Sequence, residues 1–287
     1  MSAMARLETG ASYPAVNDAQ VRGEKISFPP LPEQRRIVAI LDEAFAGLDA
    51  MRANAEKNLQ NARDLFDSYL NAVFSEKGEG WLETTLGRIA DFKNGLNFTQ
   101  SSKGEVIRIV GVKDFKNYFW IPDDGLDSVQ IDGTLSPAYE LQENDILTVR
   151  SNGNKQLIGR CILAGPVSGK TSHSGFTIRI RVKTGEIEPR FLVRYLKSAA
   201  IHNSLIESGD GANISSLNQK ALTALPVMFP SRHLQQNIVK RLEELEIDSD
   251  RLESLYRQKL AAIAELKQSI LQKAFAGELT SSESIAA

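Results

Sequence analysis

One stretch of this sequence occurs twice, and the repeat constrains the fold more than any other feature. Residues 10–74 and 211–275 align without a gap, so that each position of the first copy returns 201 positions later. About a quarter of the aligned positions are identical, among them Asn17/Asn218, Phe28/Phe229, Pro29/Pro230, Gln34/Gln235, Leu41/Leu242, Leu70/Leu271 and Phe74/Phe275. A repeat of this kind indicates that the chain uses one structural plan twice.

Each copy has a short polar lead-in, a proline-marked break and then a long segment with apolar periodicity. In the first copy the Pro-rich segment 29–32 lies where a helix can begin but not continue, because proline lacks the N–H donor that a first turn leaves unused. In the second copy Ser231 is a candidate N-cap at the same place. Between residues 34 and 74 there is no proline, and the only glycine is Gly47. About 40 residues of helix would span roughly 60 Å.

The apolar residues of these two helices recur with a period of seven. In the first copy the recurring positions are Leu41, Leu48, Ala55, Ala62 and Tyr69, with Val38, Phe45, Leu59, Phe66 and Val73 between them. In the second copy they are Leu242, Tyr256, Ile263 and Ile270, with Leu245, Leu252 and Leu266. We interpret Arg52, Ser249 and Lys259 as interruptions. Sustained heptads and matched lengths favour a coiled coil between the two helices over two amphipathic helices packed separately on a globular body.

Composition limits the class of protein. The chain has 287 residues, of which 42% are hydrophobic and 24% charged, and this is enough for one substantial core plus an extension. No apolar run approaches the length of about 20 residues that a membrane span needs. The single cysteine, Cys161, cannot form an internal disulfide, which favours an intracellular, cytoplasmic protein.

The formal net charge of −2 conceals an uneven distribution of charge. The segment 150–197 contains ten basic residues and two acidic ones, and we call it the basic stripe. The preceding segment 114–145 contains eight acidic residues and one lysine. A solvated strand face would explain part of the stripe, since Arg179 and Arg181 alternate with apolar residues. Contact with the phosphates of a nucleic acid would explain the clustering.

The residues between the two helices predict an α+β domain with a strand-rich core. Runs rich in β-branched residues, bounded by Gly, Asn, Asp and Ser, predict strands at 107–112, 145–149, 157–163 and 177–182. Helical spacing returns over 189–206.

Three loops of this domain carry polar groups suited to base recognition. Residues 93–101, 150–155 and 170–175 join or precede predicted strands, and two of these loops lie in the basic stripe. Arg and Lys donate to guanine edges, Asn and Gln pair with adenine, and Ser and Thr serve either. Taken singly, each loop is also typical of ordinary turn chemistry. The candidate DNA-binding residues are Lys93, Asn94, Asn97, Arg150, Ser151, Asn152, Asn154, Lys155, Lys170, Ser172 and His173.

The sequence contains no recognisable catalytic or metal-binding constellation. Its three histidines, His173, His202 and His233, are scattered, and there is one cysteine. Dinucleotide, Walker-type and nucleophile-elbow motifs are missing. We therefore expect a non-catalytic chain without a metal or a cofactor of its own.

The sequence 28–38, Phe-Pro-Pro-Leu-Pro-Glu-Gln-Arg-Arg-Ile-Val, precedes the first long helix, and Trp81 to Gly95 opens the next domain. Together with the repeat, these residues resemble the specificity (S) subunits of type I restriction-modification systems. The resemblance implies target recognition domains that alternate with two helical spacers, which form an antiparallel coiled coil. It also implies DNA as a ligand, docking of methyltransferase (M) subunits that use S-adenosylmethionine, and an attached restriction (R) subunit.

This chain departs from the family pattern at its start, because full-length subunits begin with a complete recognition domain. The chain resembles a half-length form with one complete domain. The expected segments are a remnant recognition-domain tail at 1–32, spacer helix 1 at 33–77, the recognition domain at 78–230, spacer helix 2 at 231–278 and a flexible tail at 279–287. A homodimer through the helical rods would restore a second recognition domain. The alternatives are a coiled-coil assembly adaptor whose central domain binds protein and, more weakly, an enzyme that acts on DNA itself.

Overall fold

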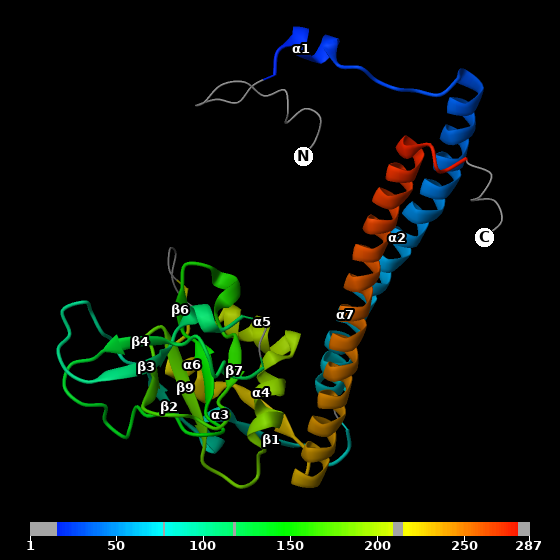
Figure 1. Cartoon of the computed structure of the whole chain (residues 1–287). Helices are drawn as coiled ribbons and strands as arrows, with labels where there is room; N and C mark the ends of the chain where they lie inside the picture. The colour runs from blue at the N-terminus through cyan, green and yellow to red at the C-terminus, as the bar shows by residue number, and fades with distance from the viewer. Residues whose placement is uncertain (1–15, 77, 117–118, 209–214, 281–287) are drawn as a thin grey trace. The chain divides into compact units, whose positions relative to one another are not determined.

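The computed structural model describes residues 16–76, 78–116, 119–208 and 215–280 (Figure 1). The chain divides into two compact units: unit 1 contains residues 1–58 and 255–287, and unit 2 contains residues 59–254. Those parts of the expected tails that fall on residues 1–15 and 281–287 lie outside the described residues. None of the helices in the described ranges is long and apolar enough to cross a membrane.

Two helices of 45 residues each, α2 (Leu31–Ser75) and α7 (Arg232–Ala276), occupy the stretches where the heptads predicted long helices. α2 begins at the proline cluster, where the Pro30 carbonyl accepts from the Gln34 amide at 3.1 Å. α7 ends at Ala276, and the next residue, Gly277, has a φ of 76°, which glycine adopts readily because it has no Cβ. A short helix, α1 (Asp18–Gly23), precedes α2 and is capped by Asn17.

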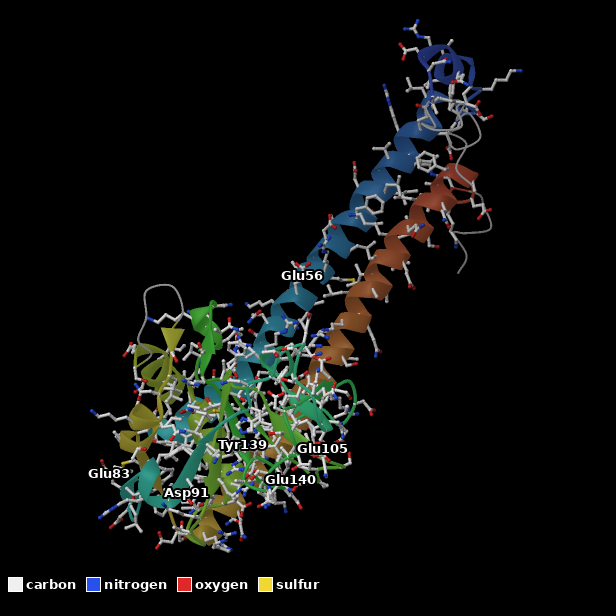
Figure 2. All side chains as sticks on the ribbon, turned by 90° about the vertical axis from the view of Figure 1, so that its left-hand side faces the viewer. Glu56, Glu83, Asp91, Glu105, Tyr139 and Glu140 are labelled. Carbon is white, nitrogen blue, oxygen red and sulfur yellow. The ribbon has the colours of Figure 1, made fainter. Side chains whose placement is uncertain are left out.

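Within unit 1 the two helices run antiparallel (Figure 1). Leu48 and Ala55 of α2 form a buried cluster with Ile263 of α7, and Phe45, Tyr256, Leu260 and Ile270 pack against it. Lys267 Nζ forms an ion pair with Asp49 at 3.0 Å and lies 4.8 Å from the Phe45 ring centroid. Glu56, labelled in Figure 2, pairs with Arg52 of the same helix and faces solvent. The predicted antiparallel coiled coil is confirmed.

Within unit 2 the remaining turns of α2 and α7 also pack together, and here one detail of the sequence prediction was wrong. Ser249 is buried in the contact between the helices and does not interrupt it, because its Oγ donates to the Ala62 carbonyl at 2.5 Å. A serine satisfies itself in this way where a small side chain allows the facing backbone to come close. Arg63 and Glu253 form an ion pair beside this contact at 3.1 Å.

The described residues of unit 2 form four small sheets, and their combination with helices confirms the α+β class. A four-stranded antiparallel sheet has the order β2 (Ala90–Asn94), β9 (Thr177–Val182), β5 (Ile146–Val149) and β7 (Cys161–Leu163). A three-stranded sheet has the order β4 (Asp127–Gln130), β3 (Val106–Val110) and β8 (Thr171–His173), with β3 and β8 parallel. β1 (Leu82–Thr85) pairs with β11 (Pro226–Phe229), and β6 (Ser151–Asn152) with β10 (Ser215–Ser216).

The strand predicted at 157–163 is shorter in the structure. Only its last three residues form β7, and they follow a 3₁₀ turn, η3 (Lys155–Leu157). Gly159 has a φ of 76°, and a Cβ there would lie 2.8 Å from Leu205 Cβ. The positive φ of Gly159 is not an extended conformation, so the strand cannot begin before this turn, which packs against Leu205.

The helical segment predicted at 189–206 is two helices. α4 (Pro189–Lys197) and α5 (Ala199–Glu207) are separated at Ser198, which is extended. α4 buries Phe191, Leu192, Val193 and Leu196 in the main core beside the four-stranded sheet. Shorter helices α3 (Leu86–Ile89) and α6 (Gln219–Ala224), with the 3₁₀ turn η2 (Val112–Asp114), complete the described elements.

Helix α4 also anchors the long helices to the body of unit 2. Phe74, near the end of α2, makes edge contacts with Phe191 and Tyr195, each at 5.4 Å between ring centroids. The buried Arg194 donates to Glu246 of α7 at 2.7 Å and lies 4.3 Å from the Phe119 ring centroid. These contacts give the globular part of unit 2 a fixed attachment to both helices.

Candidate nucleic-acid interface

The three loops that the sequence singled out meet around one turn, residues 174–177, in unit 2. The Leu96 amide donates to the His173 carbonyl at 2.8 Å, and the Gly175 amide donates to the Leu96 carbonyl at 2.7 Å. From the other side, the Arg150 amide donates to the Phe176 carbonyl at 2.8 Å. Main-chain hydrogen bonds therefore hold all three loops in one cluster, which we call the loop cluster.

Two glycines make this close approach possible. A Cβ added to Gly95 would lie 2.1 Å from the Ser174 carbonyl oxygen, and one added to Gly175 would lie 2.1 Å from Asn97 Oδ1. Real Cβ atoms do not come so near to another heavy atom, so a side chain at Gly95 would push its loop away from the backbone of the turn, whereas one at Gly175 would displace the Asn97 side chain.

The loop at 150–155 supplies the cationic side of the cluster. Arg150 is half-buried, and its Nη1 donates to the Gly175 carbonyl at 3.3 Å. Ser151 and Asn152 form β6. Asn152 Oδ1 accepts from the Asn154 amide at 2.8 Å, and Asn154 Oδ1 accepts from the Gln156 amide at 3.0 Å. Both asparagine acceptors thus shape the turn itself.

The loop at 93–97 contributes polar groups from the end of β2. Asn97 is exposed, whereas Asn94 is half-buried and its Oδ1 accepts from Gln219 Nε2 at 3.1 Å. Lys93 Nζ lies 4.3 Å above the ring of Tyr139, which Figure 2 labels. Such a cation–π contact orients the ammonium group along one side of the ring.

Two of the predicted contact residues, Ser172 and His173, are buried in β8, and this placement argues against direct DNA contact by either. Ser172 Oγ donates to the Tyr139 carbonyl at 2.7 Å. Thr177 Oγ1 donates to the Ser174 carbonyl, so it accepts from His173 Nδ1–H at 2.9 Å. Burial lowers the pKa of His173 to about 3, which keeps its ring neutral.

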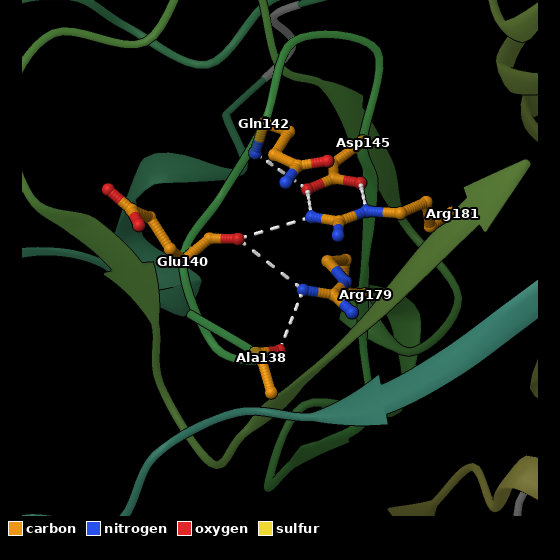
Figure 3. Close-up of polar contacts among 6 residues, drawn as sticks. All are labelled: Ala138, Glu140, Gln142, Asp145, Arg179 and Arg181. Carbon is orange, nitrogen blue, oxygen red and sulfur yellow. Dashed lines mark hydrogen bonds and ion pairs between the residues drawn. The ribbon is translucent and has the colours of Figure 1, made fainter. Parts of the chain in front are cut away.

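Several cations of the basic stripe are neutralised by carboxylates. Lys170 pairs with Glu105. This pair, together with a hydrogen bond from the Leu135 amide, holds the pKa of Glu105 below its usual range. In Figure 3 the Arg181 guanidinium donates two hydrogen bonds to the Asp145 carboxylate, at 2.6 and 2.7 Å. Arg179 is buried and donates to the Ala138 carbonyl at 3.0 Å. Arg179 and Arg181 fix the segment that leads into β5 and do not form a solvated strand face.

Two acidic residues labelled in Figure 2, Asp91 and Glu140, contact cations in or directly after β9. Asp91 pairs with Lys183 at 3.0 Å, and the Glu140 carbonyl accepts from Arg181 Nη2 at 3.1 Å. Within the residues that the structure describes, no carboxylate lies in ion-pair range of Arg150, Lys155 or Arg160. Arg150 and Lys155 of the loop cluster therefore carry positive charge that no carboxylate of the described residues offsets through an ion pair.

Sequence reasoning missed one residue of the cluster, Phe176. Its side chain is 61% exposed at the tip of the turn, between two loops that it contacts through its backbone. The Ser-Gly-Phe sequence could have revealed it, because a large aromatic directly after a turn dipeptide has little chance of reaching a core.

Comparison with known proteins identifies the family. The family model described as the Type I restriction modification DNA specificity domain matches residues 78–262, well over half of the chain. The chain belongs to this family. It is 31% identical over 292 residues to the specificity subunit of the type I restriction enzyme StySPI of Salmonella potsdam, and 25% identical over 296 residues to that of EcoKI of Escherichia coli K12. Each alignment covers 96% of this chain and 62% of the relative.

Solved structures show the same fold. A chain from a type I R-M system, studied for its complex assembly and conformational transition, matches with a TM-score of 0.74 at 23% identity. That match covers 94% of this chain and 66% of the other. The HsdS subunit of Thermoanaerobacter tengcongensis matches with a TM-score of 0.63 at 22% identity, covering 96% of this chain and 66% of that subunit. This chain therefore spans about two thirds of the length of the proteins it resembles.

Proposed function

We propose that this chain is a DNA-recognition subunit of a type I restriction-modification complex, and that the loop cluster of unit 2 reads the target bases. The observation that carries the proposal is the convergence of three polar loops at a place where, among the described residues, Arg150 and Lys155 have no carboxylate as an ion-pair partner. A site of this kind offers both base-edge donors and phosphate-neutralising charge.

We divide the roles by exposure and existing bonds. Lys155 is exposed, and we assign it to phosphate contact. Arg150, whose guanidinium has donors beyond its Nη1 bond to Gly175, and the exposed amides of Asn97 and Asn154 are assigned to base edges, where hydrogen bonding distinguishes one base pair from another. Lys93, Asn94, Ser151, Asn152 and Lys170 are assigned to support of the loops, since their polar groups are half-buried or already paired.

The remaining expectations about partners follow from the same proposal. The chain would direct M and R subunits to the target in the cytoplasm, and S-adenosylmethionine would be bound by the M subunits. This chain would hold no cofactor and perform no catalysis. The relatives are named as specificity subunits of restriction enzymes, which supports this division of labour.

Salt-dependent DNA binding tests the proposal. Lys155→Glu should weaken binding of the full chain to a duplex and reduce the slope of log affinity against log salt by about 1. Lys183→Glu is the matched control, because Lys183 is exposed, follows the far end of β9 from Thr177 and already pairs with Asp91. Fluorescence anisotropy from low to moderate salt measures both. Equal slopes for the wild type and Lys155→Glu would place the DNA surface elsewhere, and the protein-binding adaptor would become the better hypothesis.

We infer that two copies of the chain associate through their long helices, which would supply two recognition domains to one complex. Apolar side chains exposed on α2 and α7, including Val38, Met51, Leu255 and Leu266, support the idea. Light scattering of the chain, alone and with M subunits, tests it. A monomer under both conditions would overturn it.

A further inference from the structure

Phe176, at the tip of the turn 174–177, presents a large apolar side chain to solvent in the loop cluster. Residues 174–177 form a tight turn in which the Thr177 amide and hydroxyl both donate to the Ser174 carbonyl, at 2.9 and 2.8 Å. Phe176 lies at its tip with 61% of its surface exposed. Its neighbours in the turn are serine, glycine and threonine, so the ring has no apolar partner within it.

The backbone of this turn is fixed from two sides. The Phe176 carbonyl accepts from the Arg150 amide at 2.8 Å and from the Ser151 amide at 3.2 Å, while the Gly175 amide donates to Leu96. A phenyl ring on a fixed backbone has two torsions to order, so it can contact a partner at a low cost in conformational entropy. The arrangement favours recognition over a chance exposure of an apolar residue.

The surroundings of the ring specify the chemistry of its partner. Both polar neighbours lie at Gly175, the residue before Phe176: the Asn97 side chain is close to its Cα, and the Arg150 guanidinium donates to its carbonyl. The partner must therefore offer a small apolar group flanked by hydrogen-bonding edges and by negative charge. In the major groove of DNA, the C5-methyl group of thymine meets this description.

We propose that Phe176 reads a thymine by packing against its C5-methyl group. This inference rests on the proposed function, because it requires that the loop cluster faces the major groove. It adds a specificity-determining residue that acts through apolar contact, beside the hydrogen-bonding side chains of the same loops.

Removal of a single methyl group tests the proposal directly. Duplexes preferred by the full chain would first be selected from a random pool, and each thymine of the selected site would then be replaced in turn by deoxyuridine, which lacks only the methyl. One replacement should weaken binding to the wild-type chain about fourfold, the value of one buried methyl group. Phe176→Ala should bind the thymine and deoxyuridine duplexes equally.

Control variants separate this contact from a general loss of structure. Leu82→Ala removes an equally exposed apolar side chain, 62% exposed, from β1 and should keep the full methyl effect. Phe176→Ser is a second variant with a turn-compatible side chain. The fluorescence of Trp81 and Trp120, both in unit 2, verifies that each variant is folded.

Each outcome has a distinct meaning. A wild type that selects a sequence but ignores every deoxyuridine, or a methyl effect that persists in Phe176→Ala and Phe176→Ser, overturns this inference and leaves the proposed function standing. Loss of affinity for all duplexes with no methyl effect would instead assign the ring to a wedge between base pairs, and overturns it too. A wild type that selects no sequence contradicts the proposed function itself.

Discussion

The two copies of the repeat differ in burial although their local geometry is the same. Gln34 and Gln235 each donate through Nε2 to the carbonyl of the proline five residues earlier, both at 2.8 Å. Phe28, however, is 75% exposed, whereas its counterpart Phe229 is 5% exposed. Ile26 and Val227 differ in the same direction.

The difference teaches which contacts the repeat encodes by itself and which need a partner. The capping bonds are local, and both copies make them. Burial in the second copy comes from distant segments: β1 pairs with β11, with Leu82 opposite Phe229, and the Glu186 carbonyl accepts from Gln235 Nε2 at 2.8 Å. Phe28 and Gln34 of the first copy are the same residue types as Phe229 and Gln235, which pack against the globular part of unit 2. Comparing paired substitutions in the two copies separates local from non-local stabilisation.

The largest difference is expected for the paired phenylalanines. Phe229→Ala should lower the free energy of unfolding of unit 2 by about 3–5 kcal/mol, because it leaves a cavity in the core. Phe28→Ala should change it by less than about 0.5 kcal/mol, as is usual for exposed positions. Urea unfolding monitored by tryptophan fluorescence reports on unit 2, where both tryptophans lie, and unfolding monitored by circular dichroism reports on the helices of both units. Similar losses in the two variants would mean that the first copy is also packed.

The paired glutamines should differ by a smaller amount. Gln235 is fully buried, and besides the Pro230 bond it donates to the Glu186 carbonyl and accepts from the Glu188 amide at 2.8 Å. Gln235→Ala leaves these buried groups without partners and should cost about 3 kcal/mol, against about 0.5–1 kcal/mol for Gln34→Ala. The same urea titration measures the first, and helix content by circular dichroism measures the second. A cost for Gln235→Ala no larger than that for Gln34→Ala would contradict the non-local role.

Acid should lower the folding stability of unit 2 more than that of unit 1, because all three histidines lie in unit 2. The pKa of His173 falls from 6.5 to about 3 on burial, so between these values the unfolded chain binds a proton that the folded chain does not. Stability from this histidine is present above pH 6.5 and is lost as the pH falls toward 3. Unit 2 should lose about 2 kcal/mol between pH 7 and pH 5.

The control for the acid effect is His173→Asn, which keeps a group at the Nδ1 position but cannot titrate. It should remove that part of the pH dependence and leave the smaller contribution of His202, whose pKa burial also lowers. Unfolding monitored by tryptophan fluorescence at the two pH values measures both proteins. An identical pH dependence would assign the effect to other groups.

The smallest difference is expected for the paired N-caps. Asn218 Oδ1 accepts from the Ala221 amide at 2.8 Å at the start of α6, and Asn17 Oδ1 accepts from the Gln20 amide at 2.9 Å at the start of α1. Asn218→Ala should cost unit 2 about 1 kcal/mol. Asn17→Ala should reduce only the local helix content of α1, which buries no residue. Amide hydrogen exchange distinguishes a local effect from a global one, and a global effect of Asn17→Ala would show that α1 is part of a larger packed unit.

Sequence reasoning predicted those features that depend on short-range patterns. The heptads predicted α2, α7 and their pairing, and alternation predicted β9 at its observed bounds. The burial of Ser172 and His173 could not be predicted, because it results from parallel pairing of β8 with β3, whose residues lie about 60 positions earlier.

The candidate site was predicted in part for the same reason. Polar composition marked the three loops, but their convergence depends on main-chain bonds between segments distant in sequence. The neutralisation of Lys170 and Arg181 and the burial of Arg179 against backbone carbonyls likewise depend on partners that only the fold brings near. A charge count along the chain therefore overstated the basic surface.

The way in which the loop cluster is held has a consequence for how its specificity can change over time. Main-chain hydrogen bonds join the loops, and these bonds do not depend on which side chains the residues carry. Gly95 is restricted by its close approach to the backbone at residues 173 and 174, whereas Gly175 approaches only the Asn97 side chain this closely. Mutations at exposed positions such as Asn97, Asn154 and Phe176 can alter the preferred DNA sequence while the frame stays intact. A lineage could thus move from one target to another through single, individually folded steps.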